Sequence, residues 1–160
     1  MTQIAICPGS FDPITLGHLD IIERSTYIYD KVVVGIADNQ AKRALFALDE
    51  RVVMTREAVA GLKNVVIASF DGLLVRFAKE NGAQVIIKGL RAISDFEHEF
   101  QMAHLNKKLD ESIETIFMMA SPEYMFLSSS AVKEIAVFGG DLTGLVAETT
   151  AARLERKLRE

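Results

Sequence analysis

The sequence predicts one α/β domain over residues 1–160: a Rossmann-like, doubly wound sheet of five parallel strands, with helices toward the C-terminus. Three observations lead to this prediction. Short runs rich in β-branched residues alternate with longer amphipathic stretches. The short runs are continuously apolar, as in strands covered on both faces. The length of 160 residues suits a single domain, and no repeat or linker divides it.

The strands and helices are expected to alternate along the chain. The candidate strands are residues 4–7, 31–37, 65–69, 84–87 and 115–118. Apolar residues at helical spacing predict helices over residues 17–29 and 48–62, and a short one over 73–81 that Gly82 ends. A capping-box sequence at residues 94–97 opens a helix to about residue 109. Further helices are expected to start at residues 128–130 and to cover the C-terminal tail.

Composition narrows the class of protein. The net charge of −4 argues against a non-specific nucleic-acid binder, which would carry a basic surplus. Cys7, the one cysteine, cannot form an internal disulfide, and its apolar run favours a buried side chain over a nucleophile. The sequence shows neither a signal peptide nor an apolar run of the roughly 20 residues that span a bilayer. We therefore expect a cytoplasmic protein with neither a membrane nor a nucleic-acid partner.

The segment after the first strand carries the strongest functional signal. Residues 8–18, with two prolines and two glycines, predict a tight, stiff loop that leads into a helix. His18 falls in the first turn of that helix, where free N–H groups and the helix dipole favour a phosphate. A surface histidine is the bland alternative, but the order Thr15-Leu16-Gly17-His18 directly after a first strand favours phosphate binding.

Three further spots follow other strands. Lys88 and Arg91 bracket Gly89 after the fourth strand, where Arg91 could grip a phosphate and Gly89 could let the backbone approach a ligand. Residues 128–130, three serines, could cap a helix or surround phosphates with hydroxyl and N–H groups. Lys42 follows the second strand and could equally be a solvated loop lysine. The carboxyl ends of parallel strands share one edge, so we expect these spots to converge there.

These motifs resemble the phosphopantetheine adenylyltransferase family, within a nucleotidylyltransferase superfamily marked by a His-x-x-His or Thr-x-Gly-His motif. Residues 8–18, 88–91, 95–99 and 128–134 carry the resemblance, which extends over almost the whole chain. The chain departs from the common family pattern at Ser10, Lys88, His98 and Tyr124. The resemblance implies the fourth step of coenzyme A biosynthesis, in which ATP and 4′-phosphopantetheine give dephospho-coenzyme A and pyrophosphate.

The resemblance also implies the residues of the site. The ATP site would comprise Ser10, Phe11, His18, Gly89, Leu90, Arg91, Glu99, Tyr124, Met125, Phe126, Leu127, Ser128, Ser129 and Ser130. The pantetheine substrate would meet Ser10, Lys42, Leu74 and Lys88. The catalytic residues would be His18, as stabiliser of the transition state, with Lys42 and Arg91. Mg²⁺ would be held mainly by the ATP phosphates, without protein ligands of its own. A homohexamer and feedback inhibition by coenzyme A are implied as well.

Three alternatives remain open at this point. Another nucleotidyltransferase of the superfamily could use nicotinate mononucleotide or a phosphorylated alcohol as its acceptor. A non-catalytic adenine-nucleotide sensor could share the fold, because a fold does not determine a function. A sequence-tolerant RNA binder is disfavoured by the net charge and by the absence of tryptophan.

Overall fold

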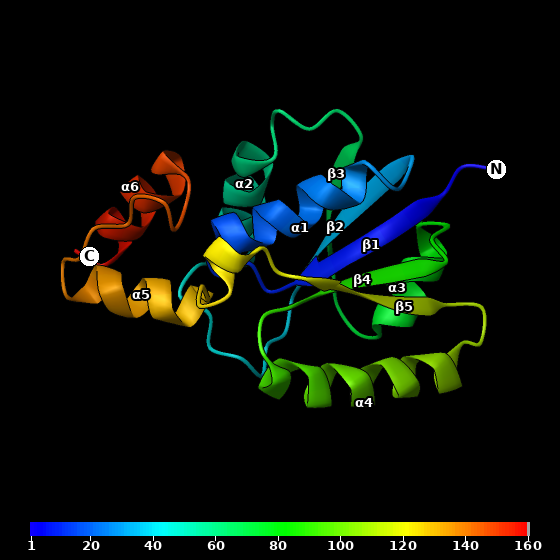
Figure 1. Cartoon of the computed structure of the whole chain (residues 1–160). Coiled ribbons are helices and arrows are strands. Elements are labelled where there is room, and N and C mark those ends of the chain that lie inside the picture. Colours follow the sequence, from blue (N-terminus) through cyan, green and yellow to red (C-terminus); the bar gives the residue numbers. More distant parts are fainter. Residues whose placement is uncertain (160) are drawn as a thin grey trace.

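The centre of the molecule is a five-stranded, all-parallel sheet in the order β3-β2-β1-β4-β5 (Figure 1). This computed structural model describes residues 1–159, apart from the side chains of residues 93 and 94. The strands are β1 Ile4–Gly9, β2 Lys31–Ala37, β3 Val65–Phe70, β4 Val85–Leu90 and β5 Glu114–Met119. The predicted parallel sheet and its five strands are therefore confirmed.

Two strands, β1 and β4, end at least two residues later than the apolar runs predicted. β1 continues through Pro8 and Gly9, which pair with Gly35 and Ile36 of β2. β4 continues to Leu90, and the neighbouring strand β5 pairs with it throughout. Lys88 and Gly89 thus lie inside a strand and not after it, because ladder hydrogen bonds, unlike apolar side chains, leave no mark in the sequence.

The predicted helices all form, with shifted ends. They are α1 Leu16–Thr26, α2 Leu48–Ala58, α3 Leu74–Glu80, α4 Ile93–Leu109, α5 Ser129–Val137 and α6 Glu148–Lys157. A short 3₁₀ helix, Pro122–Tyr124, precedes α5 and was not predicted. The expected cap of α4 was wrong: its N-cap residue is Ala92, and the predicted capping serine at position 94 has its side chain outside the described part. Gly82 follows α3 with a φ of 67°, as a glycine that ends a helix does.

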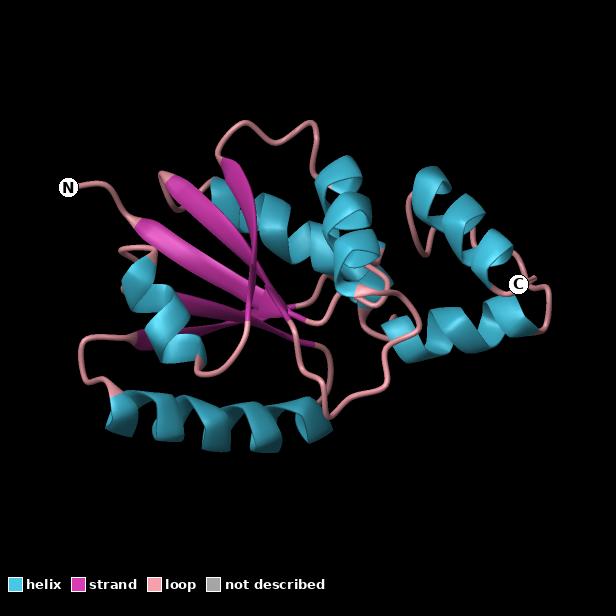
Figure 2. Ribbon diagram, turned by 180° about the vertical axis from the view of Figure 1, so that it is seen from behind, coloured by secondary structure: helices cyan, strands magenta, loops and turns pink. Residues whose placement is uncertain are grey.

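Helices cover both faces of the sheet (Figure 2). Buried Val32, Val34 and Ile36 of β2 belong to the apolar cluster shared with α1 and α2, whereas Val33 packs in a second cluster with α3. This alternation follows from the two-residue period of a strand. Cys7 is buried, which confirms its predicted role as a small apolar residue, and burial raises the pKa of its thiol to about 11.

The last two helices leave the layered part of the fold. α5 and α6 lie beyond the carboxyl ends of the strands, and α6 contacts α2 and α5 (Figures 1 and 2). Within the described residues, no helix has the length and apolarity needed to cross a bilayer. The carboxyl-end edge of the sheet is thus walled by α5 on one side and by the strand-to-helix loops on the others.

Candidate active site

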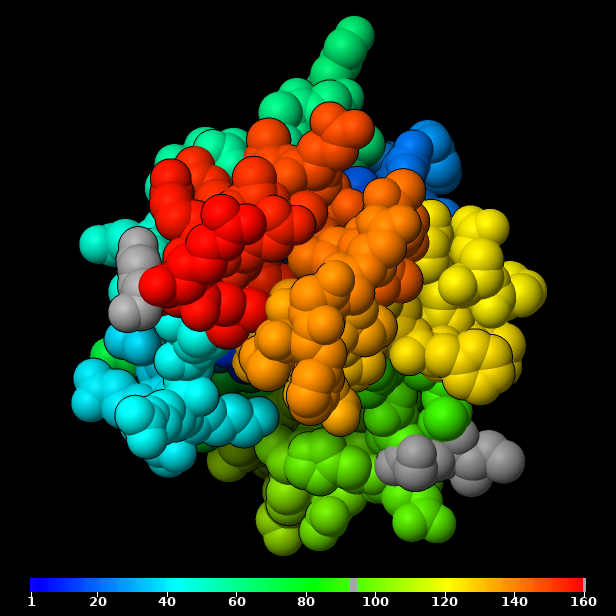
Figure 3. Space-filling view, turned by 90° about the vertical axis from the view of Figure 1, so that its left-hand side faces the viewer, coloured from blue at the N-terminus to red at the C-terminus, as the bar shows by residue number. Residues whose placement is uncertain are grey.

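A pocket of about 350 Å³ opens at the carboxyl ends of β1, β4 and β5. Figure 3 views this end of the molecule, with α5 in orange and the segment after β2 in cyan to its lower left. Most of the predicted site residues line the pocket: Ser10, Phe11, His18, Lys88, Gly89, Arg91, Glu99, Tyr124, Leu127, Ser128, Ser129 and Ser130. Loops from separate strands therefore meet at one edge, as the parallel topology predicted.

Lys42 lies in an adjoining hollow of about 220 Å³. The two hollows share Ser10, Ser129 and Ser130 as lining residues. Lys42 and three further cationic side chains line the second hollow, together with a single carboxylate: the set is Lys42, Arg43, Arg51, Lys133 and Asp12. The predicted spot after β2 is thus next to the main pocket, in a strongly cationic recess.

Four predicted residues do not line either hollow. Leu74 starts α3 and packs, partly buried, against the apolar cluster on the α3 face of the sheet. Leu90 is buried at the end of β4. Met125 and Phe126 follow the 3₁₀ helix with exposed side chains. The contacts that the resemblance implies for these four residues stay predictions.

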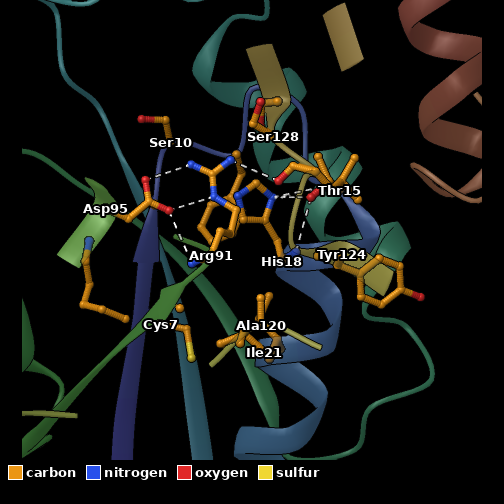
Figure 4. Close-up of a pocket in the computed structure, with 18 of the residues that line it drawn as sticks. Cys7, Ser10, Thr15, His18, Ile21, Arg91, Asp95, Ala120, Tyr124 and Ser128 are labelled. Carbon is orange, nitrogen blue, oxygen red and sulfur yellow. Dashed lines mark hydrogen bonds and ion pairs between the residues drawn. The ribbon is translucent and has the colours of Figure 1, made fainter. Parts of the chain in front are cut away.

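His18 is held in one tautomer by its own helix cap (Figure 4). The backbone N–H of Thr15 donates to His18 Nδ1 over 3.0 Å, and Thr15 Oγ1 lies 3.1 Å from the same nitrogen. Because a backbone N–H can only donate, Nδ1 is the unprotonated nitrogen and Nε2 carries the hydrogen. The Phe11 ring stands edge-on to the imidazole, with centroids 5.1 Å apart. His18 therefore presents a hydrogen-bond donor to the pocket.

The surroundings of His18 also keep it neutral. Burial, and then the positive charge of Arg91, lower the pKa of His18 to about 4. Both effects disfavour the imidazolium, which would carry a second positive charge in a partly dehydrated site. At neutral pH the side chain is a neutral donor, a form suited to stabilising negative charge that grows on a nearby oxygen.

Arg91 follows β4 and is held by α4 and by the loop before α5. Its Nε and Nη2 donate to the two carboxylate oxygens of Asp95 over 3.1 and 3.3 Å, and Nη1 donates to the Leu127 carbonyl over 3.1 Å. The guanidinium group of Arg91 is therefore held in place, and Arg91 also lines the pocket (Figure 4). Asp95 was not predicted as a site residue, because the capping-box sequence at residues 94–97 already explained an acidic residue at this position.

Lys88 and Glu99 form an ion pair across the pocket wall. Lys88 Nζ lies 3.3 Å from Glu99 Oε2, and about a quarter of each side chain is exposed. The resemblance gave the two residues to different substrates, and the structure places them beside each other on β4 and α4. A bound phosphate could therefore recruit the Lys88 ammonium only in competition with Glu99.

Two of the three serines have local structural partners. Ser128 is the N-cap of α5 and accepts the Ala131 N–H over 3.1 Å. Ser129 Oγ donates to the Pro13 carbonyl over 2.8 Å and so ties α5 to the loop after β1. Ser130 is exposed at the border of both hollows. All three serines line the main pocket, and the expectation that their hydroxyl and N–H groups surround phosphates stays a prediction.

Gly89 lines the pocket and also has a packing role. A Cβ at this position would lie 3.0 Å from Ile21 Cγ1, so the glycine allows α1 to pack closely on β4. Helix–strand packing thus requires a glycine here, and its expected role of letting the backbone approach a ligand stays a prediction.

Three charged residues of the site were not predicted as site residues, although Asp12 and Lys133 lie within the motifs at residues 8–18 and 128–134. Asp12, Arg51 and Lys133 line the second hollow and join segments far apart in the chain. Arg51 sits on a helix among other charged residues, and nothing in the local pattern marks it as 5% exposed. Only the packing of α2 against the loops identifies it.

A resident metal centre finds little support in the described residues. No group of three or more histidine, cysteine, aspartate or glutamate side chains among them could hold a metal ion. Of the pocket carboxylates, Asp95 pairs with Arg91 and Glu99 with Lys88.

Comparison with known proteins defines the class of this site. Residues 6–135 match the model of the cytidylyltransferase-like family, so the chain is a nucleotidyltransferase of that family. A putative nicotinate-nucleotide adenylyltransferase from Vibrio parahaemolyticus has the same fold, with a TM-score of 0.74 over 100% of this chain and 97% of its own, at 18% identity.

Closer relatives narrow the family. Phosphopantetheine adenylyltransferases from Caldanaerobacter subterraneus and Carboxydothermus hydrogenoformans are 53% and 55% identical, each over 99% of this chain and 99% and 98% of their own. The one from Clostridium tetani is 57% identical over 90% of both chains. The chain therefore belongs to the phosphopantetheine adenylyltransferase family.

Proposed function

We propose that this chain reversibly transfers the adenylyl group of ATP to 4′-phosphopantetheine, giving dephospho-coenzyme A and pyrophosphate. Its near full-length identity of more than half with phosphopantetheine adenylyltransferases carries the proposal. The pocket adds chemical support: a neutral imidazole donor, a fixed guanidinium and a helix start face one cavity. The volume of about 350 Å³ lies within the usual range for a small-molecule site.

The ATP triphosphate is proposed to occupy the main pocket. His18 Nε2 donates to an α-phosphate oxygen, where negative charge develops as the new bond forms. Arg91 and the first turn of α5 hold the outer phosphates, since a guanidinium fork and a helix N-terminus both favour phosphate. Because Asp95 and the Leu127 carbonyl already orient Arg91, little side-chain freedom is lost when the phosphates bind.

The acceptor phosphate is proposed to enter from the Lys42 side. A phosphate monoester is largely a dianion at neutral pH, so it attacks the α-phosphorus without giving up a proton, and no general base is needed. The new P–O bond forms as the bond to pyrophosphate breaks. Ser10, which borders both hollows, and Lys42 orient the attacking oxygen.

Mg²⁺ is proposed as the metal of the reaction, carried on the ATP phosphates. The carboxylates of the pocket support this arrangement, because Asp95 and Glu99 are already paired with Arg91 and Lys88. When bound, the ion neutralises charge on the outer phosphates and so helps pyrophosphate to leave.

Assembly, regulation and location stay proposals. Exposed large apolar side chains on α4, namely Phe96, Phe100, Met102, Leu105 and Leu109, support contact with further copies of the chain, and the resemblance implies six copies in all. Coenzyme A is proposed as a feedback inhibitor in the cytoplasm. Sedimentation tests the assembly, and competition between coenzyme A and ATP tests the inhibition.

A panel of acceptors tests the function. We expect pyrophosphate release from ATP with 4′-phosphopantetheine and a product of the mass of dephospho-coenzyme A. Nicotinate mononucleotide is the alternative acceptor in the panel, because a putative nicotinate-nucleotide adenylyltransferase has the same fold. At 18% identity, that likeness shows the fold alone. Faster turnover with nicotinate mononucleotide would overturn the proposal.

A further inference from the structure

Asp12 is a buried carboxylate in the loop that follows β1. Only 7% of the residue is exposed, and it lines the recess that holds Lys42. A buried charge is costly unless it is paired and hydrogen-bonded, so a carboxylate at this position needs specific partners. Its partners come from two distant segments, one on each side of the candidate site.

On one side, Asp12 holds the segment that carries Lys42. Oδ1 accepts the Phe46 N–H and Oδ2 accepts the Leu45 N–H, both over 2.9 Å. These N–H groups lie near the end of the connection 38–47 between β2 and α2, in which Lys42 is exposed. The position of Lys42 therefore depends on a backbone anchor at Asp12.

Buried Arg51 fixes the same connection against the loop after β1. Its Nη1 donates to the Ala37 carbonyl over 3.0 Å and to the Ser10 carbonyl over 2.9 Å, and its Nε donates to the Phe46 carbonyl over 3.2 Å. The connection is thus held at its beginning by Arg51 and at its end by both Arg51 and Asp12. Only its middle, with Lys42, is left to reach into the recess.

On the other side, Asp12 holds α5. Lys133 Nζ donates to Asp12 Oδ2 over 3.0 Å. One helical turn earlier, Ser129 Oγ donates to the carbonyl of Pro13, the residue that follows Asp12. Two contacts on one side of α5 therefore fix the helix start against residues 12 and 13.

The charge of Asp12 is maintained by these contacts. Burial alone would raise the pKa of the carboxyl, but the N–H groups of Leu45 and Phe46 and the ammonium of Lys133 outweigh it and lower the pKa. The carboxylate thus stays ionised at neutral pH and can hold all three partners at once.

We propose that Asp12 is a positioning residue that sets the spacing between the Lys42 segment and the start of α5. Under the proposed function, on which this inference rests, the two elements hold the acceptor phosphate and the outer phosphates of ATP. An in-line attack requires both to be placed together, and misplacement by about 1 Å can cost roughly a hundredfold in rate. Asp12 would act through its neighbours and would not touch the reacting atoms.

Asp12 has two arms of contacts: one to the Lys42 segment, through the Leu45 and Phe46 N–H groups, and one to α5, through Lys133. Three variants and a control separate the two arms. Asp12→Asn weakens both arms, Lys133→Met removes only the arm to α5, and Lys133→Arg restores the charge at that position. Glu57→Gln breaks a comparable 2.7 Å ion pair with Arg153, outside both hollows, and controls for lost stability. For each protein, kcat, both KM values, the thermal midpoint and the ATP dissociation constant by calorimetry are measured.

We expect a split that a purely structural role would not produce. Lys133→Met should weaken ATP binding roughly tenfold while the acceptor KM stays within about twofold, and Lys133→Arg should recover most of the loss. Asp12→Asn should raise both KM values and lower kcat at saturation by roughly ten- to a hundredfold. Glu57→Gln should match the wild type in all kinetic constants.

Three results would overturn the inference. One is an acceptor KM and kcat of Asp12→Asn at wild-type values. Another is tighter ATP binding by Asp12→Asn, which would show that Lys133 binds phosphate directly once released. The third is a loss of kcat that is explained by the fall in thermal midpoint in every variant, the control Glu57→Gln included. If the wild type transfers no adenylyl group, the proposed function fails, and the ATP dissociation constants still decide the α5 arm.

Discussion

The backbone N–H of Thr15 donates to His18 Nδ1 over 3.0 Å, and the backbone N–H of His18 in turn donates to Thr15 Oγ1 over 3.3 Å. The two residues form a reciprocal capping box at the start of α1, with a histidine where glutamate or glutamine is usual. One pair of contacts thus caps the helix and sets the tautomer of the imidazole. The start of α1 and the His18 imidazole are therefore held by the same two residues.

His18→Gln separates these two roles. Glutamine at this position can still accept the Thr15 N–H, so the capping box and the thermal midpoint should be retained. Turnover should fall by roughly a hundredfold or more, because the donor to the α-phosphate is lost, while ATP affinity should change much less. Steady-state kinetics and thermal melting check both parts.

His18→Ala serves as the comparison for that variant. It should lose turnover to a similar extent and also lose about 1 kcal/mol of stability with the cap. Near-normal turnover in either variant would show that the role assigned to His18 is wrong.

The pH dependence of stability should carry a signature of His18. Its pKa is about 4 in the folded chain and near the ordinary 6.5 in the unfolded chain. Between these values the unfolded state binds more protons, so this contribution is complete above pH 6.5 and is lost as the pH falls toward 4. The slope is at most about 1.4 kcal/mol per pH unit.

Denaturant unfolding at pH 7 and pH 5 measures this effect. Wild type should lose more stability between the two pH values than His18→Gln, which has no imidazole to protonate. Equal losses in the two proteins would mean that the imidazole is not kept neutral by the fold.

Removal of the Arg91 charge should raise the pKa of His18. In Arg91→Met, burial still disfavours the imidazolium but the repulsion is gone, so the pKa should rise above about 4 and stay below 6.5. NMR titration of the His18 ring in the free enzyme gives the value. Arg76→Met, at an exposed position of α3, is the matched control and should leave it unchanged. If the pKa of His18 is the same in Arg91→Met as in the wild type, the Arg91 charge does not contribute to the low pKa of the imidazole.

Gly35→Ala should destabilise the sheet without altering the site. A Cβ at Gly35 would lie 2.6 Å from the Phe77 ring and 3.2 Å from the Phe70 ring, and these rings stack with centroids 4.4 Å apart. Overpacking of this kind costs about 1–3 kcal/mol. Gly61→Ala is the control, because nothing lies within 4 Å of its added Cβ. Chemical denaturation measures both, and an equal change in the two variants would contradict the packing argument.

Much of the fold and part of the site could be predicted from the sequence. Apolar runs located all five strands, because a strand covered on both faces must be apolar throughout. His18 and Arg91 stood out because each follows a strand of a parallel sheet, and such positions share one edge. The partners of these residues could not be predicted in the same way. Asp95 looked like a capping residue, and the hydroxyl of Ser129 gave no sign that it would bond to Pro13, 116 residues earlier.

The sequence by itself determined the order of strands and helices, the loop motif around His18 and the family, because periodicity and short-range motifs are local properties of the chain. Tertiary structure decided which nitrogen of His18 is protonated, how Arg91 is held and how Asp12 joins the Lys42 segment to α5. The contact of Lys133 with Asp12 joins residues far apart in sequence, whereas that of Thr15 with His18 is local but depends on side-chain distances, burial and charge in a shared cavity. Such quantities exist only once the chain has folded, since burial and long-range pairing are properties of the packed molecule.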